Sequence, residues 1–354
     1  RYFTLFFRQG AFRPDEQGRL FLDDVLAASN AYAVALEEDV EENVYRALEH
    51  LMQGFLDLPH NDLGADDVRD IYDNSLYLLY RLLFILYGES RGLLPMEEEQ
   101  YREYFSLERI TRDIAEGNVS RTGMTTMVWG RLRQLFRIIN GDNAALNRSL
   151  GVPRYNGGLF DPQRHPFLED HEVGDRALVE ALDLLSRRRT ETGREFVDYR
   201  TLSVRHLGSI YEGLLEYQPR MAEEPMVAVG DEWLKTSEVS ENLRGPKAVD
   251  RREPGQVYLV TDRGERKATG SYYTPQYIVE YIVEHTVGPL IEEATERVKA
   301  RAKDAGTNAA RVQAAQSLVD EILHLKVLDP AMGSGHFLVE ATEYLARALA
   351  TDPY

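Results

Sequence analysis

Val327-Leu328-Asp329-Pro330-Ala331-Met332-Gly333-Ser334-Gly335-His336-Phe337-Leu338 is the stretch from which the fold can be worked out. The largely apolar run from 322 to 328 predicts a buried parallel strand with Asp329 at its carboxyl end. Gly333 and Gly335 then provide a tight turn into a helix. Open α/β sheets bind ligands at the carboxyl ends of their strands. We therefore expect an α/β domain with a nucleotide-type cofactor at this loop.

Composition places the chain among ordinary globular proteins. It has 354 residues, 43% of them hydrophobic, which is enough for two or three domains with large cores. No cysteine occurs, so disulfides, thiolate metal sites and cysteine nucleophiles are excluded, and a cytoplasmic location is expected. The opening residues lack the pattern of a signal peptide, and no apolar stretch reaches transmembrane length. Because residue 1 is arginine, we expect a piece of a longer protein.

The charge of the chain argues against nucleic-acid binding over its whole surface. The formal net charge is -18, whereas affinity for DNA comes largely from Lys and Arg that release counterions. Any DNA contact is therefore local or lies outside this chain. Two local patches qualify: Arg131 with Arg133 and Arg137 on one expected helix, and the arginine run 187–189. A solvated helical face or a helix end is the simpler interpretation of both patches.

Apolar residues at three- and four-residue spacing predict mostly helices from about Asp23 to Leu215. We expect residues 1–222 to form an α-helical domain. Its clearest helix runs from Asn74 to Arg91, with Asn74 or Ser75 as its N-cap and apolar side chains on almost every side. Such a helix is buried on most sides. A second helix carries one apolar stripe for packing, made of Leu207, Ile210, Tyr211, Leu214 and Leu215.

Beyond this domain the pattern changes. Residues 223–268 predict a small β-containing connector, with strands at 227–229 and 257–260 and loop signals at Leu243 to Pro246 and Asp262 to Gly264. Residues 269–354 are expected to begin a further domain. Within it, the composition of 291–315 predicts a surface pair of helices interrupted at Gly306.

The loop at Asp329 does not match the two commonest nucleotide-binding patterns. A dinucleotide fingerprint needs a third glycine where this chain has Leu338, and a P-loop needs Gly-Lys-Ser/Thr, which is absent. The segment Asp329 to Leu338 instead resembles motif I of DNA adenine methyltransferases, whose cofactor is S-adenosylmethionine. Upstream, Ala268-Thr269-Gly270-Ser271-Tyr272-Tyr273-Thr274-Pro275 resembles motif X, which precedes motif I in the gamma-ordered class of these enzymes.

Three segments of the helical region extend this resemblance. Tyr80 to Phe84, Tyr155 to Phe160 and His206 to Leu215 resemble the helical region of type IIG restriction-modification enzymes and of the adenine methyltransferases in BREX and DISARM phage-defence systems. The resemblance spans most of the chain from about Asp73 onward. It implies a Rossmann-like S-adenosylmethionine-dependent methyltransferase domain that follows an α-helical N-terminal domain.

The resemblance also implies roles for individual residues. Asp329 would face the methionine amino group, and Gly333 with Gly335 would let the backbone approach the cofactor. Phe337 would line the pocket or anchor the helix, and His336 is better explained as a structural hydrogen bonder. Pro275 fits the first turn of a helix, with Thr274 as its cap and Ile278, Val279, Ile282 and Val283 as its buried face. The implied cofactor-binding residues are Tyr272, Tyr273, Thr274, Pro275, Asp329, Ala331, Met332, Gly333, Ser334, Gly335 and Phe337.

The chain departs from the family at the catalytic motif. The Asn/Asp-Pro-Pro-Tyr/Phe motif that holds the target adenine is absent, and Thr351-Asp352-Pro353-Tyr354 lacks one proline and follows motif I too soon. We expect no catalytic residue in this chain and no turnover by it alone. Double-stranded DNA would be bound largely outside it, other subunits of a phage-defence system are possible partners, and no membrane is expected. Two alternatives stay open: a bifunctional restriction-modification enzyme with an upstream nuclease, and a scaffold or sensing subunit of a defence complex.

Two further patterns resemble metal sites. Asp250 with Glu265 and Lys267 has the bare form of a nuclease D...ExK site, but the last two are expected in a hairpin that leads into motif X. His165, Glu169, Asp170 and His171 lack the i, i+4 histidine spacing, and Pro166 interrupts them. A solvated loop explains the second group better, and no metal is expected.

Overall fold

The computed structural model describes residues 6, 8–14, 19–155, 157–190, 193–202, 204–215, 217–230, 232–239, 250–261, 274–304, 307–333 and 335–351. The chain divides into two compact units, each described separately below. The first comprises Arg1–Ser203 and Tyr217–Asp262, and the second comprises Val204–Glu216 and Arg263–Tyr354. The helix that starts at Val204 therefore groups with the second unit, although the sequence pattern places it within 1–222.

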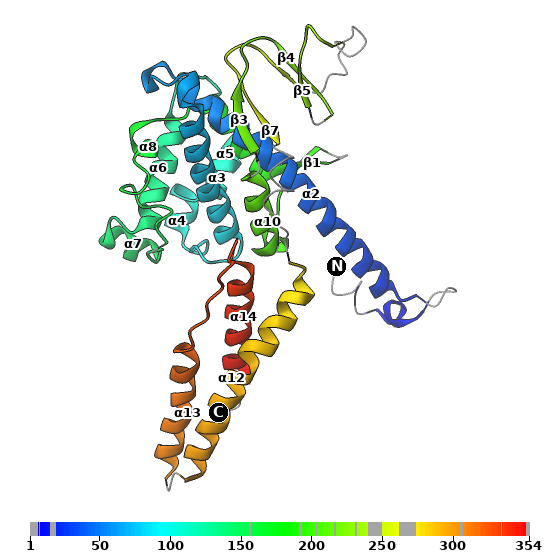
Figure 1. The fold of residues 1–354 in the computed structure, drawn as a ribbon, viewed down its shortest axis with the longest axis vertical. Coiled ribbons are helices and arrows are strands. Elements are labelled where there is room, and N and C mark those ends of the chain that lie inside the picture. Colours follow the sequence, from blue (N-terminus) through cyan, green and yellow to red (C-terminus); the bar gives the residue numbers. More distant parts are fainter. Residues whose placement is uncertain are drawn as a thin grey trace. The chain divides into compact units, whose positions relative to one another are not determined.

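Helices make up most of the first unit (Figure 1). Its helices and 3-10 turns are η1(Gln9–Phe12), α2(Phe21–Leu56), η2(Pro59–Asn61), η3(Ala65–Asp67), α3(Val68–Ser90), α4(Glu99–Tyr104), α5(Leu107–Ala115), α6(Met127–Asn140), α7(Ala144–Leu150), α8(Phe167–Asp170), α9(Asp175–Ser186) and η4(Tyr199–Thr201). Helices α2 and α9 pack so closely that a Cβ added at Gly54 would lie 2.5 Å from the Ala177 Cβ. Small residues at a helix crossing permit this close approach.

Helix α3 confirms the expected buried helix, but it starts earlier than predicted. It begins at Val68 rather than at Asn74, and Ser75 lies fully buried inside it instead of capping it. Leucine and isoleucine side chains are buried on several sides of the helix, as the all-round apolar pattern predicts. Its end is marked by Gly92, whose φ of 69° is a left-handed value that glycine adopts without strain.

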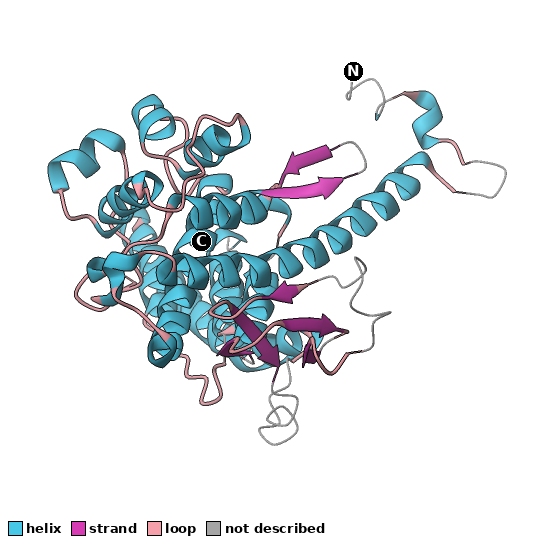
Figure 2. Ribbon diagram, turned by 90° about the horizontal axis from the view of Figure 1, so that it is seen from above, coloured by secondary structure: helices cyan, strands magenta, loops and turns pink. Residues whose placement is uncertain are grey.

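Small antiparallel sheets complete the first unit, and Figure 2 shows strands on either side of the long helix α2. The strands are β1(Arg187–Thr190), β2(Gly193–Phe196), β3(Tyr217–Met221), β4(Met226–Val229), β5(Glu232–Lys235), β6(Arg251–Arg252) and β7(Val257–Thr261). β1 pairs with β2, β3 pairs with β7, and β4 lies between β5 and β6. The two predicted strands are therefore confirmed, whereas β3 precedes the predicted connector. The loop signals at 243–246 and 262–264 lie outside the described residues.

The β1–β2 hairpin corrects the interpretation of the arginine run 187–189. These residues were expected on a solvated helical face or at a helix end, but α9 stops at Ser186 and the run forms a strand. Its register pairs Arg187 with Phe196 and Thr190 with Gly193. A run of arginines has no apolar alternation, so nothing in its periodicity indicates a strand.

The second unit consists of helices around two small apolar clusters. Its helices are α10(Val204–Leu214), α12(Gln276–Asp304), α13(Asn308–Leu323) and α14(His336–Thr351). Helices α12 and α13 confirm the expected helical pair, although α12 is one long helix that begins directly after Pro275. One cluster buries Val279, Val283, Val287 and Ala341, and the other buries Ala294, Val298, Leu318 and Ile322.

The predicted strand from 322 to 328 is wrong. Helix α13 continues to Leu323, the following residues form neither helix nor strand, and the Leu328 side chain is 86% exposed. A strand needs a neighbour for its backbone N–H and C=O groups, and the described part of this unit contains no strand to pair with. The described chain is mostly helical with small antiparallel sheets, and the expected parallel sheet is not part of it. No helix among the described residues combines the length and apolar character that crossing a membrane requires.

Candidate cofactor site

The loop from Asp329 to Gly335 has the turn-into-helix geometry that the sequence predicts. The backbone N–H of Ala331 donates to Asp329 Oδ1 at 2.9 Å, and that of Gly335 donates to the Met332 carbonyl at 2.8 Å. Helix α14 begins at the next residue, His336. Gly333 and Gly335 have φ values of 52° and 88°, a left-handed backbone that strains any residue with a Cβ. These contacts fix the loop without a strand before it.

The carboxylate of Asp329 has one oxygen occupied and one free for a ligand. While Oδ1 accepts from Ala331, Oδ2 is buried and has no hydrogen-bond partner among the described residues. An unsatisfied buried acceptor costs free energy, so this oxygen suits a bound donor, above all a cationic one. Asp329 therefore combines a fixed orientation with an unused acceptor.

The backbone beside Asp329 leaves room for a ligand. A Cβ added at Gly335 would have no heavy atom within 4 Å, and one added at Gly333 would lie 3.4 Å from Glu212 Oε1. Glu212 belongs to α10, so its carboxylate lies beside the backbone of the loop at Gly333. Of the predicted apolar stripe, Ile210 and Leu214 are buried and Leu207 is half-buried, whereas Tyr211 and Leu215, the residue after the end of α10, are exposed.

A chain of polar side chains joins the start of α12 to α14. His336 Nε2 lies 2.6 Å from Gln276 Oε1, and Gln276 Nε2 donates to Glu340 Oε2 at 2.8 Å. Arg347 donates to the other oxygen of the nearly fully buried Glu340 at 2.7 Å. His336 thus has a structural hydrogen bond. Gln276 and Glu340 were not among the predicted site residues, although a glutamate on the apolar face of α14 is a signal of a buried polar partner.

The residues of the motif X segment are described only in part. Tyr272 and Tyr273, like Ser334 of motif I, lie outside the described residues. The Pro275 carbonyl accepts from the N–H groups of Ile278 and Val279, which places Pro275 at the start of the helix as predicted. Thr274 is half-buried. Of the predicted apolar face, Val279 and Val283 are buried, Ile278 is half-buried and Ile282 is exposed.

Among the other expected cofactor residues, Phe337 packs against the cluster around Val279 and Val283, which anchors helix α14. Met332 is exposed. The Phe337 side chain therefore packs in the core of the second unit, whereas the Met332 side chain is accessible to a ligand.

Two of the helical segments that carry the resemblance meet in the first unit. Arg81 Nε donates to the Leu159 carbonyl at 2.8 Å, and the ring of Phe84 lies 5.4 Å from the rings of both Tyr155 and Phe160. Arg81 is almost fully buried, and this burial lowers the pKa of its guanidinium to about 10. These two segments therefore pack against each other in the structure. Asn156 lies outside the described residues.

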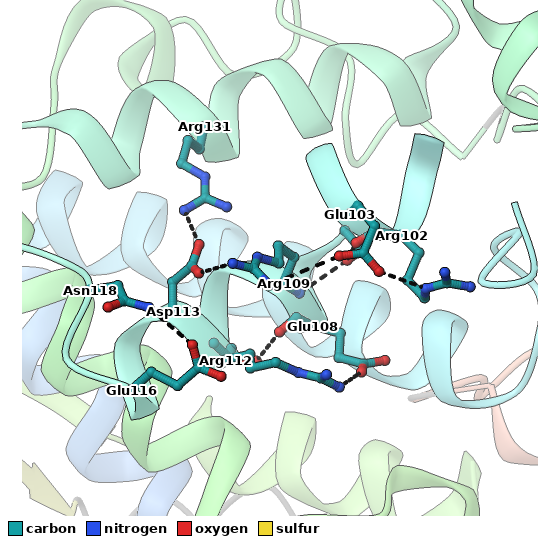
Figure 3. Close-up of polar contacts among 11 residues, drawn as sticks. Arg102, Glu103, Glu108, Arg109, Arg112, Asp113, Glu116, Asn118 and Arg131 are labelled. Atoms are coloured by element: carbon teal, nitrogen blue, oxygen red, sulfur yellow. Dashed lines mark hydrogen bonds and ion pairs between the residues drawn. The ribbon is translucent and has the colours of Figure 1, made fainter. Parts of the chain in front are cut away.

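The arginines of α6 are partly exposed, as the solvated-face interpretation expects, but each is paired with a carboxylate. Arg131 pairs with Asp113 at 2.9 Å, and Asp113 also pairs with Arg109 at 2.8 Å (Figure 3). Arg133 and Arg137 both pair with Glu169, at 3.1 and 3.0 Å. The partners lie on other helices and far away in the sequence, so periodicity along one helix does not reveal these pairs.

The residues of the two patterns that resemble metal sites also make structural contacts. His165 is buried, with Nε2 3.2 Å from the Gly158 carbonyl, and Glu169 and Asp170 belong to the one-turn helix α8 rather than to a solvated loop. Within the described ranges, no group of three or more His, Asp or Glu residues is arranged to hold a metal ion. In the other pattern, Asp250 Oδ1 lies 3.9 Å from the Arg252 guanidinium. Glu265 and Lys267 lie outside the described residues.

Comparison with known proteins gives one informative similarity. The chain is 23% identical over 298 residues to a protein of Methanocaldococcus jannaschii whose name gives it, provisionally, as a type II restriction enzyme and methyltransferase. The match covers 77% of this chain and 20% of that protein, so the chain spans about a fifth of the length of its relative. No family model and no solved structure matches.

Proposed function

We propose that this chain carries the S-adenosylmethionine-binding part of a DNA adenine methyltransferase from a restriction-modification or phage-defence system. The observation that carries the proposal is the carboxylate of Asp329, with one oxygen held by Ala331 and the other buried and unused. The similarity to a restriction enzyme and methyltransferase supports the class of protein. The adenine specificity rests on the resemblance of motifs X and I alone.

The residues at the loop suit S-adenosylmethionine in charge and leave space beside the backbone at Gly335. Its α-amino group is a cation with N–H donors, which matches the unused Asp329 Oδ2. The absence of side chains at Gly333 and Gly335 lets the rest of the cofactor approach the backbone closely, and at Gly335 no heavy atom occupies that space. The amino end of α14 adds a positive field that suits a carboxylate or a sugar oxygen. When bound, the cofactor supplies an electrophilic methyl group on a sulfonium.

The residues of this chain hold the cofactor in one orientation. Ala331 fixes the rotation of the Asp329 carboxylate, because the hydrogen bond to Oδ1 directs Oδ2 elsewhere. The Gln276 to Glu340 hydrogen bond holds the start of α12, and with it Pro275, against α14. Methyl transfer is a direct displacement, so most of the catalytic effect comes from such positioning. The target adenine would be rotated out of the duplex to reach the pocket.

The test is methyl transfer by the full-length protein to duplex DNA, followed by mass spectrometry of the nucleosides. We expect N6-methyladenine, and we expect Asp329→Asn to abolish its formation because an amide cannot balance the charge of the amino group. Asp320→Asn on the exposed face of α13 is the matched control and should retain activity. Methylation of cytosine, or full activity of Asp329→Asn, contradicts the proposal.

A second candidate is a bifunctional enzyme that also cleaves DNA. It is favoured by the name of the M. jannaschii relative, which covers both activities. Incubation of the full-length protein with Mg²⁺ and unmethylated plasmid tests it. Cleavage that premethylation by the same protein prevents is the expected result, and an intact plasmid at all protein concentrations rejects this second activity.

A further inference from the structure

The β1–β2 hairpin places three arginines on one of its faces. Arg187 and Arg189 are two residues apart on β1 and therefore point to the same side of the hairpin. Arg194 lies directly opposite Arg189 in the strand register, so it shares that side. Like charges directly opposite each other destabilise a strand pair. This arrangement needs anions to offset it.

A single buried carboxylate offsets part of this charge. Asp183 at the end of α9 has a side chain that is only 3% exposed. Its Oδ1 accepts from Arg187 Nε at 2.6 Å, and its Oδ2 pairs with Arg194. Both oxygens of Asp183 are therefore used, and Arg187 and Arg194 are held in place by it. Asp183 does not pair with Arg189.

These residues line a cavity of about 260 Å³ with α2 as its other wall. We call it the arginine pocket, and its lining consists of Asp39, Glu42, Asn43, Arg46, Asp183, Leu184, Arg187, Arg189 and Arg194. Arg46 and Arg189 are exposed and have no ion pair or hydrogen bond within the part of the chain that the structure describes. Four arginines face three carboxylates here, whereas the whole chain has 41 basic and 59 acidic residues. The pocket is thus cationic in an acidic protein.

We propose that the arginine pocket binds a phosphate group through Arg46 and Arg189. The planar guanidinium fork matches phosphate oxygens in a bidentate geometry, and Arg194, held by Asp183, adds charge beside them. Phosphate of this kind comes either from the backbone of a nucleic acid or from a small phosphate compound. The choice of duplex DNA as the first source rests on the proposed function, whereas phosphate binding itself does not. Glu42 also lines the pocket and weakens the site by repulsion.

The first measurement is binding of a fluorescent DNA duplex to the full-length protein over a series of salt concentrations. Arg46→Gln with Arg189→Gln is expected to weaken binding roughly tenfold per lost contact, because hydrogen bonds to charged groups are strong. The slope of log affinity against log salt should fall by about 1 for each contact. Glu42→Gln should have the opposite effect and tighten binding. The matched control is Arg148→Gln on α7, an exposed arginine away from the pocket, which should change neither quantity.

The second measurement separates the two sources of phosphate. Calorimetry with inorganic pyrophosphate compares the same variants, whose fold is checked by circular dichroism and by binding of S-adenosylmethionine. Weaker DNA binding by the Arg46 and Arg189 variants assigns the pocket to a nucleic-acid backbone. Loss of pyrophosphate binding with unchanged DNA binding assigns it to a small phosphate compound. Unchanged affinity for both DNA and pyrophosphate overturns the proposal. If the variants then still bind S-adenosylmethionine, the arginine-pocket proposal fails while the methyltransferase proposal does not.

Discussion

The two units of the chain bury their apolar residues to very different degrees. The first unit has a core with large, fully buried side chains such as Trp129, Tyr72 and Phe55. The second unit buries mostly valine and alanine in two clusters of four residues, and Leu323 and Leu328, which precede the loop at Asp329 in the sequence, are exposed. Deep burial therefore stabilises the helical unit, whereas local hydrogen bonds and a few small contacts hold the loop from Asp329 to Gly335. Substitutions of buried residues should therefore reduce stability more in the first unit than in the second.

The largest effect is expected from Leu82→Ala in α3, where the leucine is fully buried. Removing a leucine from a well-packed core costs about 4 kcal/mol, from lost transfer free energy and from the cavity that remains. Urea unfolding followed by circular dichroism measures it. The exposed Leu93→Ala is the control and should cost well under 1 kcal/mol. Equal costs for the two variants would show that the first unit lacks the tight core assigned to it.

The next effect concerns the pH dependence of the first unit. Burial raises the pKa of Glu89 from 4.5 to about 7, although three donors bind its carboxylate: Tyr101 Oη and the N–H groups of Leu107 and Glu108. Between pH 4.5 and 7 the folded state keeps a proton that the unfolded chain has released. Stability should therefore fall as pH rises through this window, by on the order of 3 kcal/mol, and level off above it.

Glu89→Gln isolates this titration because glutamine carries no charge at any pH. Melting temperatures across the same pH range should lose most of their downward slope in the variant. At pH below 4.5, where Glu89 is protonated in both states, the variant should be about 1 kcal/mol less stable than the parent, since one backbone N–H loses its acceptor. A variant that keeps the full slope would show that another group causes it.

The helical unit was the part of the fold that sequence patterns predicted best. A helix such as α3 has a period that repeats over many residues, and its type follows from that repeat even when its start is misplaced by several residues. The short run from 322 to 328 offers no such repeat. Its first two residues complete α13, and the others would form a strand only beside another strand. Local composition cannot indicate whether that partner is present.

In the candidate site, too, local features were predicted and contacts between distant residues were not. Asp329, Gly333 and Gly335 were predicted because a tight turn depends on residues close together in sequence. Contacts between distant residues were not predicted, among them Gln276 with Glu340 and Arg137 with Glu169. Both pairs depend on how the helices pack. The sequence alone does not give the distance between residues on different helices. For the same reason the arginines 187–189 were assigned to a helix rather than to a hairpin.

Within the second unit, Val279→Ala should cost about 2 kcal/mol, less than the leucine change in the first unit, because fewer methyl groups are lost. Val279 is fully buried between α12 and α14, so the loss should also loosen the contact that holds Phe337. Hydrogen exchange of α14 amides measures the effect. The exposed Val319→Ala on α13 serves as the control. Protection unchanged in α14 would show that this cluster does not hold the helix.

The smallest effect on stability is expected from Gly335→Ala. The residue has a φ of 88°, so a Cβ there costs about 1 kcal/mol even though the space around it is open. Gly64→Ala is the control, because its φ of -143° is negative and no atom lies near the added Cβ. Thermal unfolding compares the two. A Gly335 variant as stable as the parent would show that the loop can change its backbone freely.

The most direct test of the proposed cofactor site is calorimetry of S-adenosylmethionine binding to the full-length protein and to Asp329→Asn. The parent should bind, and the variant should bind at least tenfold more weakly, because a charge-assisted hydrogen bond from the amino group to Oδ2 is lost. Asp320→Asn should bind like the parent. No binding by the parent, or equal affinity of the parent and Asp329→Asn, would contradict the assignment of this loop as the methyl-donor site.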